Sequence, residues 1–484
     1  MKGLWAAVIL MIGETVMAAP AAAVATTHLT PVSCPFASDA PTHRATCSRF
    51  TREDDGLSIA FDVAVLTPST RKSIGHVLYI PGGPGEAPVS EDGLFDDLLI
   101  PFANRTVVLF NPRGTRGTEP RLACDFGALV WDEDFGDAAA QAILRDCIAR
   151  FGRDGPDPAR FTSLDIAEDI DALAGALGIL SMGLYGISYG TEAGLHLVAQ
   201  EPDWLEFAIL DSVSVPGVSG TKDEIKARDR FLTALDRLCF AGARCPAIAR
   251  GDATTLSDWA AQFDDAPLGV YVQDDVEWTL ESTDILDYLS QLGAYRNGLD
   301  LALALIGSLE TGRLRALGWI RGDIVSNTAF MAENLPLMLQ AYADTYDPGD
   351  ADIIRRPTRY PLDLEDAAMH LDFYRLWRGA RAREARFLKG EYAVPGIPVL
   401  VLSGGLDPFT PVEWAEALHR RLGGLQHYIF PHLGHAVSIN TGTVSGESDI
   451  TTQMHCAGGA VRAFLDPTLD PDDLCQAYRA ESDQ

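Results

Sequence analysis

The sequence predicts an α/β protein with a mostly parallel sheet, helices on both faces and a large helical insertion. Short apolar runs of strand length alternate with amphipathic helical runs up to residue 212. This alternation is typical of parallel sheets whose two faces are both covered. Residues 213–394 then show mainly helical patterns, and strand-like runs resume near residue 395. We therefore expect a core made of residues 26–212 and 395–484, with a helical cap over 213–394.

The composition is that of a globular protein with a strongly acidic surface. Of the 484 residues 47% are hydrophobic and 22% are charged, which provides ample apolar side chains for a core. Asp and Glu number 68 against 38 Lys and Arg, so the net charge is −30. Such a surface repels nucleic acid and anionic lipid. We expect no nucleic-acid partner, and the composition leaves the oligomeric state open.

The N-terminus predicts export. Lys2 precedes an apolar run from Leu4 to Ile12, and small-x-small sites follow near Ala18 and Ala23. This is the pattern of a secretory signal peptide, and its apolar core is too short for a membrane span. We expect residues 1–25 to be removed, a mature protein with no membrane span, and a periplasmic or extracellular location.

The cysteines agree with export. An even number of cysteines in an exported protein suggests disulfides, and no Cys-x-x-Cys or His-x-x-x-His cluster suggests a metal. About a hundred connectivities are possible for eight cysteines, so pairing by sequence proximity is a hypothesis from spacing. The proposed pairs are Cys34 with Cys47, Cys124 with Cys147, Cys239 with Cys245, and Cys456 with Cys475.

The first part of the core follows a strand and helix order. Residues 26–56 are rich in proline and read as loop. Alternating or apolar runs predict strands at 57–66, 76–80 and 105–110. A helix is expected over 164–177, where Thr162 and Asp165 resemble a capping box.

A Gly-x-Ser-x-Gly motif, Gly186-Ile-Ser188-Tyr-Gly190, lies between an apolar strand at 182–185 and a helix at 191–198. Strand, sharp turn and helix form the context in which a serine projects from a strained elbow. Glycines fit where the backbone turns too tightly for a Cβ. The alternative is a glycine-rich turn, because the chain has 44 glycines and chance matches occur. A further strand is expected at 207–210.

The remainder of the chain predicts the cap and the return to the sheet. Helical stripes occur at 231–238, 301–309, 335–342 and 367–377, and the last carries arginines that we interpret as a solvated helix face. Strands are expected at 398–402 and 426–430, and a helix at 457–464.

Two residues after these late strands can activate the serine. A serine hydroxyl needs a base, and the base needs an orienting carboxylate. Asp407 follows the strand at 398–402 and His435 follows the strand at 426–430, so the chain order is Ser188, Asp407, His435. Ligands of open α/β sheets bind at the carboxyl ends of strands, where all three are expected. Asp211 is the alternative acid and His432 the alternative base.

An oxyanion hole is the third requirement. One donor is the backbone N–H of the residue after the nucleophile, here Tyr189. The second comes from a loop after an earlier strand, and Gly82-Gly83-Pro84-Gly85 is suited to it because glycines allow close approach. We choose Gly83 as this donor.

These motifs together resemble the secreted tripeptidyl aminopeptidases, within the prolyl aminopeptidase-like α/β-hydrolases. The resemblance extends from about Cys34 to Cys475 and implies the α/β-hydrolase fold with Ser188, Asp407 and His435 as the triad. It also implies removal of amino acids or short peptides from free N-termini, with cap residues that bind the α-ammonium. It depends on Gly82–Gly85, Arg113-Gly114-Thr115, the serine motif, Leu406-Asp407-Pro-Phe-Thr410-Pro411 and Gly434-His435, with Cys124 and the Cys456–Cys475 segment. The chain departs from the pattern at Pro81, Asn111 and Arg116.

The sequence thus predicts an exported serine hydrolase, an aminopeptidase of the tripeptidyl or prolyl type that forms an acyl-enzyme at Ser188. The expected substrates are peptides with a free N-terminus, and no metal or organic cofactor is required. An esterase or lipase with the same triad is the first alternative, because fold and triad do not determine the acyl substrate. A non-catalytic α/β-hydrolase used for binding is the second.

Overall fold

The computed structural model describes most of the chain. The residues described are 27–35, 42–54, 56–90, 99–125, 138–151, 155–215, 221–242, 251–272, 276–309, 330–341, 359–360, 373–377, 395–439, 449–466, 468–469 and 473–480. The predicted signal peptide, Cys245 and most of the arginine-rich stretch near 375–386 lie outside these ranges. Among the helices of the described ranges, none is long and apolar enough to cross a membrane.

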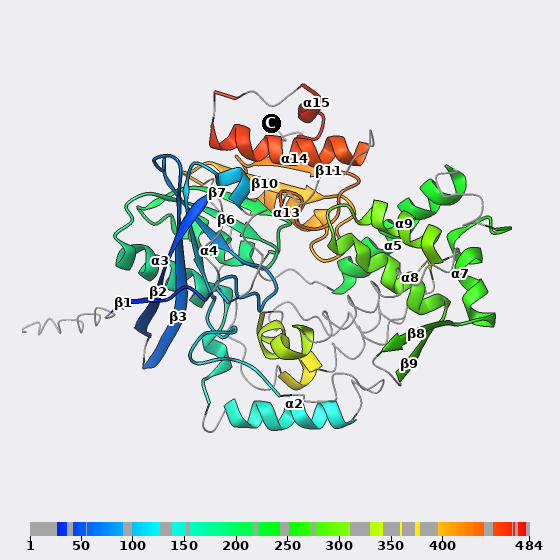
Figure 1. Cartoon of the computed structure of the whole chain (residues 1–484), viewed down its shortest axis with the longest axis horizontal. Helices are drawn as coiled ribbons and strands as arrows, with labels where there is room; N and C mark the ends of the chain where they lie inside the picture. The colour runs from blue at the N-terminus through cyan, green and yellow to red at the C-terminus, as the bar shows by residue number, and fades with distance from the viewer. Residues whose placement is uncertain are drawn as a thin grey trace, which may run out of the picture.

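A nine-stranded sheet forms the core, in the order β1-β2-β3-β5-β4-β6-β7-β10-β11. The strands from β5 to β11 are parallel, and β1, β2 and β3 join the sheet in antiparallel fashion. The predicted mostly parallel sheet is therefore confirmed (Figure 1). The strands are β1 (Thr27–Val32), β2 (His43–Asp54), β3 (Leu57–Pro68), β4 (His76–Ile80), β5 (Thr106–Phe110), β6 (Met182–Ile187), β7 (Leu205–Asp211), β10 (Val399–Gly404) and β11 (Gln426–Phe430).

The expectation of loop over residues 26–56 was wrong, because β1 and β2 lie there. Pro31 is in β1, which is the edge strand of the sheet, where a missing backbone donor is tolerated. The β2 strand is rich in arginine and threonine and pairs along its whole length with β3. Because β2 is mostly polar, it lacks the apolar alternation by which strands are predicted from sequence.

Helices cover both faces of the sheet, as predicted. One face packs against α3 (Ser163–Leu177), α4 (Gly190–Gln200) and α13 (Val412–Leu422), which share a buried cluster with Val108, Leu184 and Val401. The other face packs against α14 (Asp449–Leu465) and the 3₁₀ turn η1 (Ile100–Phe102), with Tyr79, Tyr185 and Leu402 buried between. The Thr162–Asp165 capping box at the start of α3 is present.

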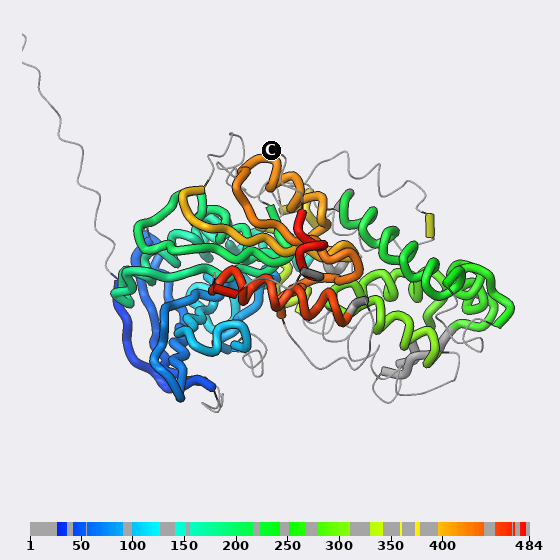
Figure 2. The backbone as a smooth tube through the Cα atoms, turned by 90° about the horizontal axis from the view of Figure 1, so that it is seen from above, coloured from blue at the N-terminus to red at the C-terminus, as the bar shows by residue number. Residues whose placement is uncertain are grey.

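The insertion after β7 is a separate group of helices beside the sheet, seen at the right of Figure 1 and, from above, of Figure 2. Its apolar faces meet in a cluster that contains Phe231, Trp259, Leu286 and Ile306 and is continuous with the core under α14. A second helical stretch, residues 330–341, packs near Cys124 and Trp377. The helices of the insertion are α5 (Thr221–Asp236), the π-helical η4 (Arg237–Ala241), α7 (Leu256–Asp265), α8 (Ser282–Gln291), η6 (Leu292–Ala294) and α9 (Gly298–Leu309).

A β-hairpin interrupts this helical region. Strands β8 (Leu268–Val272) and β9 (Val276–Leu280) pair antiparallel and form a separate two-stranded sheet. The sequence predicts a helical insertion between residues 213 and 394 and gives no sign of these strands. The two strands are only five residues each, which is too short for their alternation to be distinguished from a helical surface.

Disulfides link segments that are close in the sequence. Three of the bonds are between the expected partners, Cys34–Cys47, Cys124–Cys147 and Cys456–Cys475. Cys239 is also disulfide-bonded, and its expected partner Cys245 lies outside the described residues. The first bond joins Cys34, just after β1, to β2. The second joins Cys124, after β5, to α2 (Ala138–Phe151), and the third joins α15 (Asp473–Gln476) to α14.

Candidate active site

Ser188 lies on a sharp turn between β6 and α4. Its φ is +54°, in the left-handed region that side-chain-bearing residues rarely adopt. A methyl group at Gly190 would lie 2.3 Å from the carbonyl oxygen of Ile80, so only glycine permits this approach of the turn to β4. The Ser188 carbonyl accepts hydrogen bonds from the Thr191 N–H at 2.9 Å and the Thr191 hydroxyl at 2.5 Å. The turn therefore holds a partly exposed serine in a strained conformation, as the motif predicts.

His435 and Asp407 are joined by a direct hydrogen bond. Asp407 follows β10 and His435 follows β11, and the His435 Nδ1 donates to the Asp407 Oδ2 at 2.7 Å. The Asp407 side chain is buried, and its oxygens also accept from the backbone N–H groups of Phe409 and Thr410 at 2.9 Å. The Thr410 hydroxyl donates to the Oδ2 at 2.6 Å. These bonds fix the carboxylate, which in turn orients the imidazole and leaves its Nε2 to act as a base.

The electrostatic environment favours the protonated form of His435. Burial of the ring would lower its pKa, but the charge of Asp407 and its hydrogen bond outweigh burial, so the pKa is raised. The charges of Asp211 and Glu86 act in the same direction. An imidazolium formed during proton transfer is therefore stabilised at this position.

The strands place these groups at one edge of the sheet. Strands β6, β7, β10 and β11 are neighbours and parallel, so their carboxyl ends lie on the same side. Ser188, Asp407 and His435 follow such ends, and Asp211 is the last residue of β7. This is the edge at which open α/β sheets bind ligands. The arrangement can support nucleophilic acyl transfer.

Asp211, the alternative acid, has a different set of contacts. Its carboxylate accepts hydrogen bonds from the backbone N–H groups of Val437 at 3.1 Å and Ser438 at 2.7 Å, and from the Ser438 hydroxyl. The Tyr185 hydroxyl is 2.7 Å from the same Ser438 oxygen. Asp211 thus holds the loop that follows His435, whereas the His435 Nδ1 contacts the Asp407 carboxylate and the Thr410 hydroxyl.

His432, the alternative base, is held by α14. Its backbone N–H donates to the Gln453 Oε1 at 2.9 Å, and its Nδ1 is 3.2 Å from the Gln453 Nε2. The backbone and the ring of His432 thus both contact the side-chain amide of Gln453, and these contacts link the loop after β11 to α14.

The glycine loop after β4 lies over the serine. A methyl group at Gly82 would be 3.1 Å from the Ser188 Cβ, and Gly83 has a φ of +104°. Tyr189, the other expected oxyanion donor, is at the start of α4 and is buried. The Gly82 N–H donates to the Glu86 Oε2 at 3.1 Å. Sequence reasoning missed Glu86, although an acidic residue directly after a glycine loop is a visible signal.

Two departures from the family pattern now have structural explanations. The Asn111 amide nitrogen donates to the Ser90 hydroxyl at 2.8 Å and to the Arg116 carbonyl at 3.2 Å, while its oxygen accepts from the Val89 N–H at 2.9 Å. An ionised carboxylate only accepts hydrogen bonds, so an aspartate at this position could make neither of the two donor contacts. The Arg116 side chain pairs with Glu333 of the 330–341 helix at 2.7 Å.

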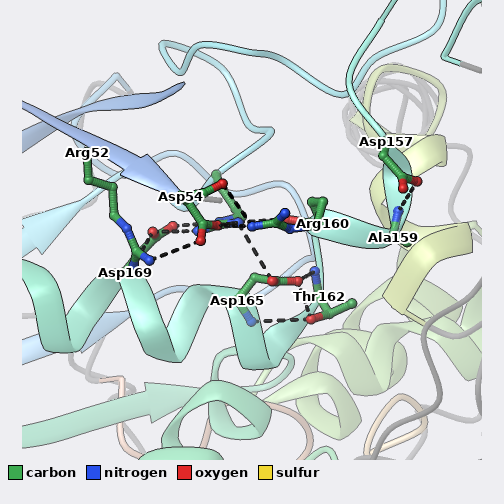
Figure 3. Close-up of polar contacts among 9 residues, drawn as sticks. Arg52, Asp54, Asp157, Ala159, Arg160, Thr162, Asp165 and Asp169 are labelled. Atoms are coloured by element: carbon green, nitrogen blue, oxygen red, sulfur yellow. Dashed lines mark hydrogen bonds and ion pairs between the residues drawn. The ribbon is translucent and has the colours of Figure 1, made fainter. Parts of the chain in front are cut away.

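Arg113 of the same loop is buried and takes part in an ion network. Figure 3 labels four other members of this network, Arg52, Asp54, Arg160 and Asp169. Arg113 binds both oxygens of Asp169 at 2.6 Å and one oxygen of Asp54 at 3.0 Å. Arg52 contacts these two carboxylates at 3.1 and 3.2 Å, and Arg160 contacts Asp54 at 2.8 Å. The network connects β2, the loop after β5 and α3.

Among the described residues, one set of three acidic side chains is close enough together to be considered as a metal site, and it adjoins this network. Oxygens of Asp54, Asp165 and Glu168 are all within 4.8 Å of one another. The oxygens of Asp54 already contact guanidinium groups of Arg52, Arg113 and Arg160. Arginine charge therefore compensates the carboxylates at this place, and we assign no metal to it.

The chain is similar to a mycobacterial serine protease over part of its length. It is 28% identical over 210 residues to "Serine protease Hip1" of Mycobacterium bovis and of Mycobacterium tuberculosis, a region that is 38% of this chain. The chain spans only 39% of the length of those relatives.

Solved structures resemble the chain at low identity. A serine hydrolase from Cycloclasticus zankles is 12% identical over 88% of this chain and 99% of its own, with a TM-score of 0.36. An enzyme described as degrading N-acyl homoserine lactones is 14% identical over 80% of this chain and 93% of its own, with a TM-score of 0.34. Neither likeness informs the choice of substrate. Residues 75–440 match the family described as alpha/beta hydrolase fold, and this chain belongs to that family.

Proposed function

We propose that this protein is an exported aminopeptidase in which Ser188, His435 and Asp407 form the catalytic triad. The observation that carries the proposal is the 2.7 Å hydrogen bond from the His435 Nδ1 to Asp407, at the same sheet edge as Ser188 with its φ of +54°. A base oriented by a buried carboxylate beside a serine on a strained elbow is the arrangement that acyl transfer requires.

The first half of the reaction forms an acyl-enzyme. The Ser188 Oγ attacks the scissile carbonyl carbon while its proton passes to the Nε2 of His435. The same proton is then given to the leaving amine as the carbon–nitrogen bond breaks. Asp407 stabilises the imidazolium that forms between these two transfers. The backbone N–H groups of Gly83 and Tyr189 bind the oxyanion; loss of such a donor costs about 10²–10³ in rate.

The second half releases the acid product. Water attacks the acyl-enzyme carbonyl while His435 takes one of its protons, and that proton returns to the Ser188 oxygen as the ester bond breaks. The chain's own residues supply the nucleophile, the base and the oxyanion donors, so the reaction is complete without a further reagent besides water.

Two observations support a peptide substrate and export. The region of 28% identity is shared with a serine protease, and the glycine-loop, serine and Asp407 motifs resemble those of aminopeptidases. Disulfides such as Cys34–Cys47 persist in oxidising compartments. We expect residues 1–25 to direct the chain out of the cytoplasm.

Initial rates of the purified protein on matched substrates test the proposal. We would use alanyl, prolyl and trialanyl 4-nitroanilides, each with a free or an acetylated amine, and a 4-nitrophenyl ester. The Ser188→Ala variant is the control for contaminating activity. Turnover of the free-amine amides, lost in the variant, supports an aminopeptidase. Ester turnover without amide turnover would retain the serine hydrolase and replace the aminopeptidase by an esterase.

A serine-reactive fluorophosphonate probe provides a separate test of the triad. We expect it to label the folded protein at Ser188 and not the Ser188→Ala variant. A folded protein that is not labelled and hydrolyses none of these substrates would show that the chain is a non-catalytic member of the family.

A further inference from the structure

Glu86 places a carboxylate beside the candidate nucleophile. Its Oε2 accepts the Gly82 N–H at 3.1 Å. A methyl group at Gly82 would lie 3.1 Å from the Ser188 Cβ and 3.5 Å from the Glu86 Oε1, so both side chains border the same small space. Glu86 and Ser188 are both partly exposed.

A fixed negative charge at this place affects the reaction. Negative charge develops on the substrate oxygen as Ser188 attacks, and the charge of Glu86 repels it. Glu86 also contributes to the raised pKa of His435, together with Asp407 and Asp211. A neutral acyl group brings no positive charge of its own to offset this repulsion, which makes Glu86 less favourable for the attack on ordinary esters and blocked peptides. A cationic group on the substrate would remove the penalty and add an attraction.

We propose that Glu86 binds the α-ammonium group of the substrate and thereby selects peptides with a free N-terminus from which single residues are released. This inference rests on the proposed aminopeptidase function. It assigns ammonium binding to a residue directly after the glycine loop, whereas the family resemblance implies that residues of the cap bind the ammonium.

The length of the released fragment follows from covalent geometry. In an N-terminal residue the amine nitrogen is only two bonds from the carbonyl carbon that Ser188 attacks, which places the ammonium beside the serine. In a tripeptidyl fragment the ammonium is two residues further away, about 7 Å for an extended chain. A carboxylate that shares the space around Gly82 with Ser188 therefore matches the release of one residue.

The test compares wild type with Glu86→Gln on alanyl, N-acetylalanyl and trialanyl 4-nitroanilides. Glutamine retains the acceptor for the Gly82 N–H and the side-chain volume, and removes the charge. We expect kcat/KM for the alanyl substrate to fall about 10- to 100-fold, as for other hydrogen bonds to charged groups. We expect kcat/KM for the N-acetyl substrate to stay equal or rise. The acid limb of the pH profile of Glu86→Gln should move to lower pH, because the pKa of His435 falls when the charge of Glu86 is lost.

Glu333→Gln is the matched control. Glu333 pairs with Arg116 and Arg121 beside the same loops, so its loss tests a general disturbance of the region. We expect it to leave the ratio between the alanyl and N-acetyl substrates unchanged.

The outcomes separate the two proposals. A wild type that prefers the free amine supports the aminopeptidase, and a selective loss in Glu86→Gln supports ammonium binding. Equal losses of kcat/KM on the alanyl and N-acetylalanyl substrates would mean that Glu86 only stabilises the glycine loop. This result would overturn the ammonium-binding inference but not the proposed aminopeptidase function. A loss confined to the trialanyl substrate would also overturn it, because the ammonium would then lie farther from Ser188. A wild type without free-amine preference would overturn both.

Discussion

The backbone N–H of Ser188 donates to the carbonyl oxygen of Asp211 at 3.0 Å, while the carboxylate of Asp211 holds the loop after His435. One residue at the end of β7 thus connects the strained serine turn with the loop that carries the base. Because the acceptors are a main-chain and a side-chain group of one buried residue, Asp211 fixes the two loops relative to each other.

Asp211→Asn and Asp407→Asn should have different effects. An asparagine at 211 loses one acceptor of the Ser438 bonds, so we expect a loss of unfolding free energy of about 1–3 kcal/mol. At 407 asparagine disrupts the orientation of His435, and kcat should fall by about 10⁴, as in other serine triads. Urea denaturation and steady-state kinetics measure the two effects. The reverse pattern would make Asp211 the acid.

The pH profile should follow the raised pKa of His435. Catalysis requires the neutral imidazole, so kcat/KM should fall as the pH drops through a pKa that lies above the ordinary value of 6.5. In Asp407→Asn the acid limb should move to lower pH, because the charge that raises the pKa is lost. An unmoved limb in this variant would mean that another group controls the profile.

The same shift has the opposite consequence for stability. A group whose pKa is raised by folding stabilises the native state below its unfolded pKa, and loses this contribution as the pH rises through its folded pKa. The part of the unfolding free energy that comes from the His435–Asp407 pair should therefore be present below about pH 6.5 and decline above it. Urea denaturation of wild type and Asp407→Asn across this range measures the difference.

Gly434→Ala should disturb the contact between the candidate base and the helical insertion. A methyl group there would lie 2.3 Å from the Gly293 carbonyl oxygen and 2.4 Å from that of Tyr295, and backbone cannot move aside cheaply. We expect a loss of about 1–3 kcal/mol in unfolding free energy, with reduced kcat because His435 is the next residue.

Gly175→Ala is the control for this substitution. Gly175 is on the exposed side of α3, and no atom lies within 4 Å of an added methyl group. Alanine there should stabilise the protein by about 0.5–1 kcal/mol and leave kcat unchanged. If Gly434→Ala behaved like this control, the close approach of the insertion to His435 would not matter for the site.

Arg113→Met should be among the most destabilising substitutions. It keeps the apolar stem but leaves Asp169 without its bidentate partner in a buried place, which costs about 3–5 kcal/mol. Arg420→Met, at an exposed pair 3.9 Å from Glu416, should change the unfolding free energy by less than about 1 kcal/mol. Similar urea midpoints for both variants would contradict a structural role of the network.

Much of the core followed from the sequence. The apolar runs of β4, β5, β6, β10 and β11 are short, buried and bounded by Gly or Pro, and the α3 capping box marks its helix start. Where apolar pattern was weak, prediction failed: β2 is polar, and the β8–β9 hairpin is short.

The sequence by itself determined the candidate residues for the chemistry, because a strained serine turn and polar residues after buried strands leave a local pattern. The local pattern of Asp211 and Asp407 is the same, a carboxylate after a strand, and only the tertiary structure decided that His435 contacts Asp407 while Asp211 holds the neighbouring loop. It likewise placed Glu86 beside Ser188. The physical reason is that hydrogen-bond partners and local charge depend on distances between strands far apart in the chain, which sequence spacing does not contain.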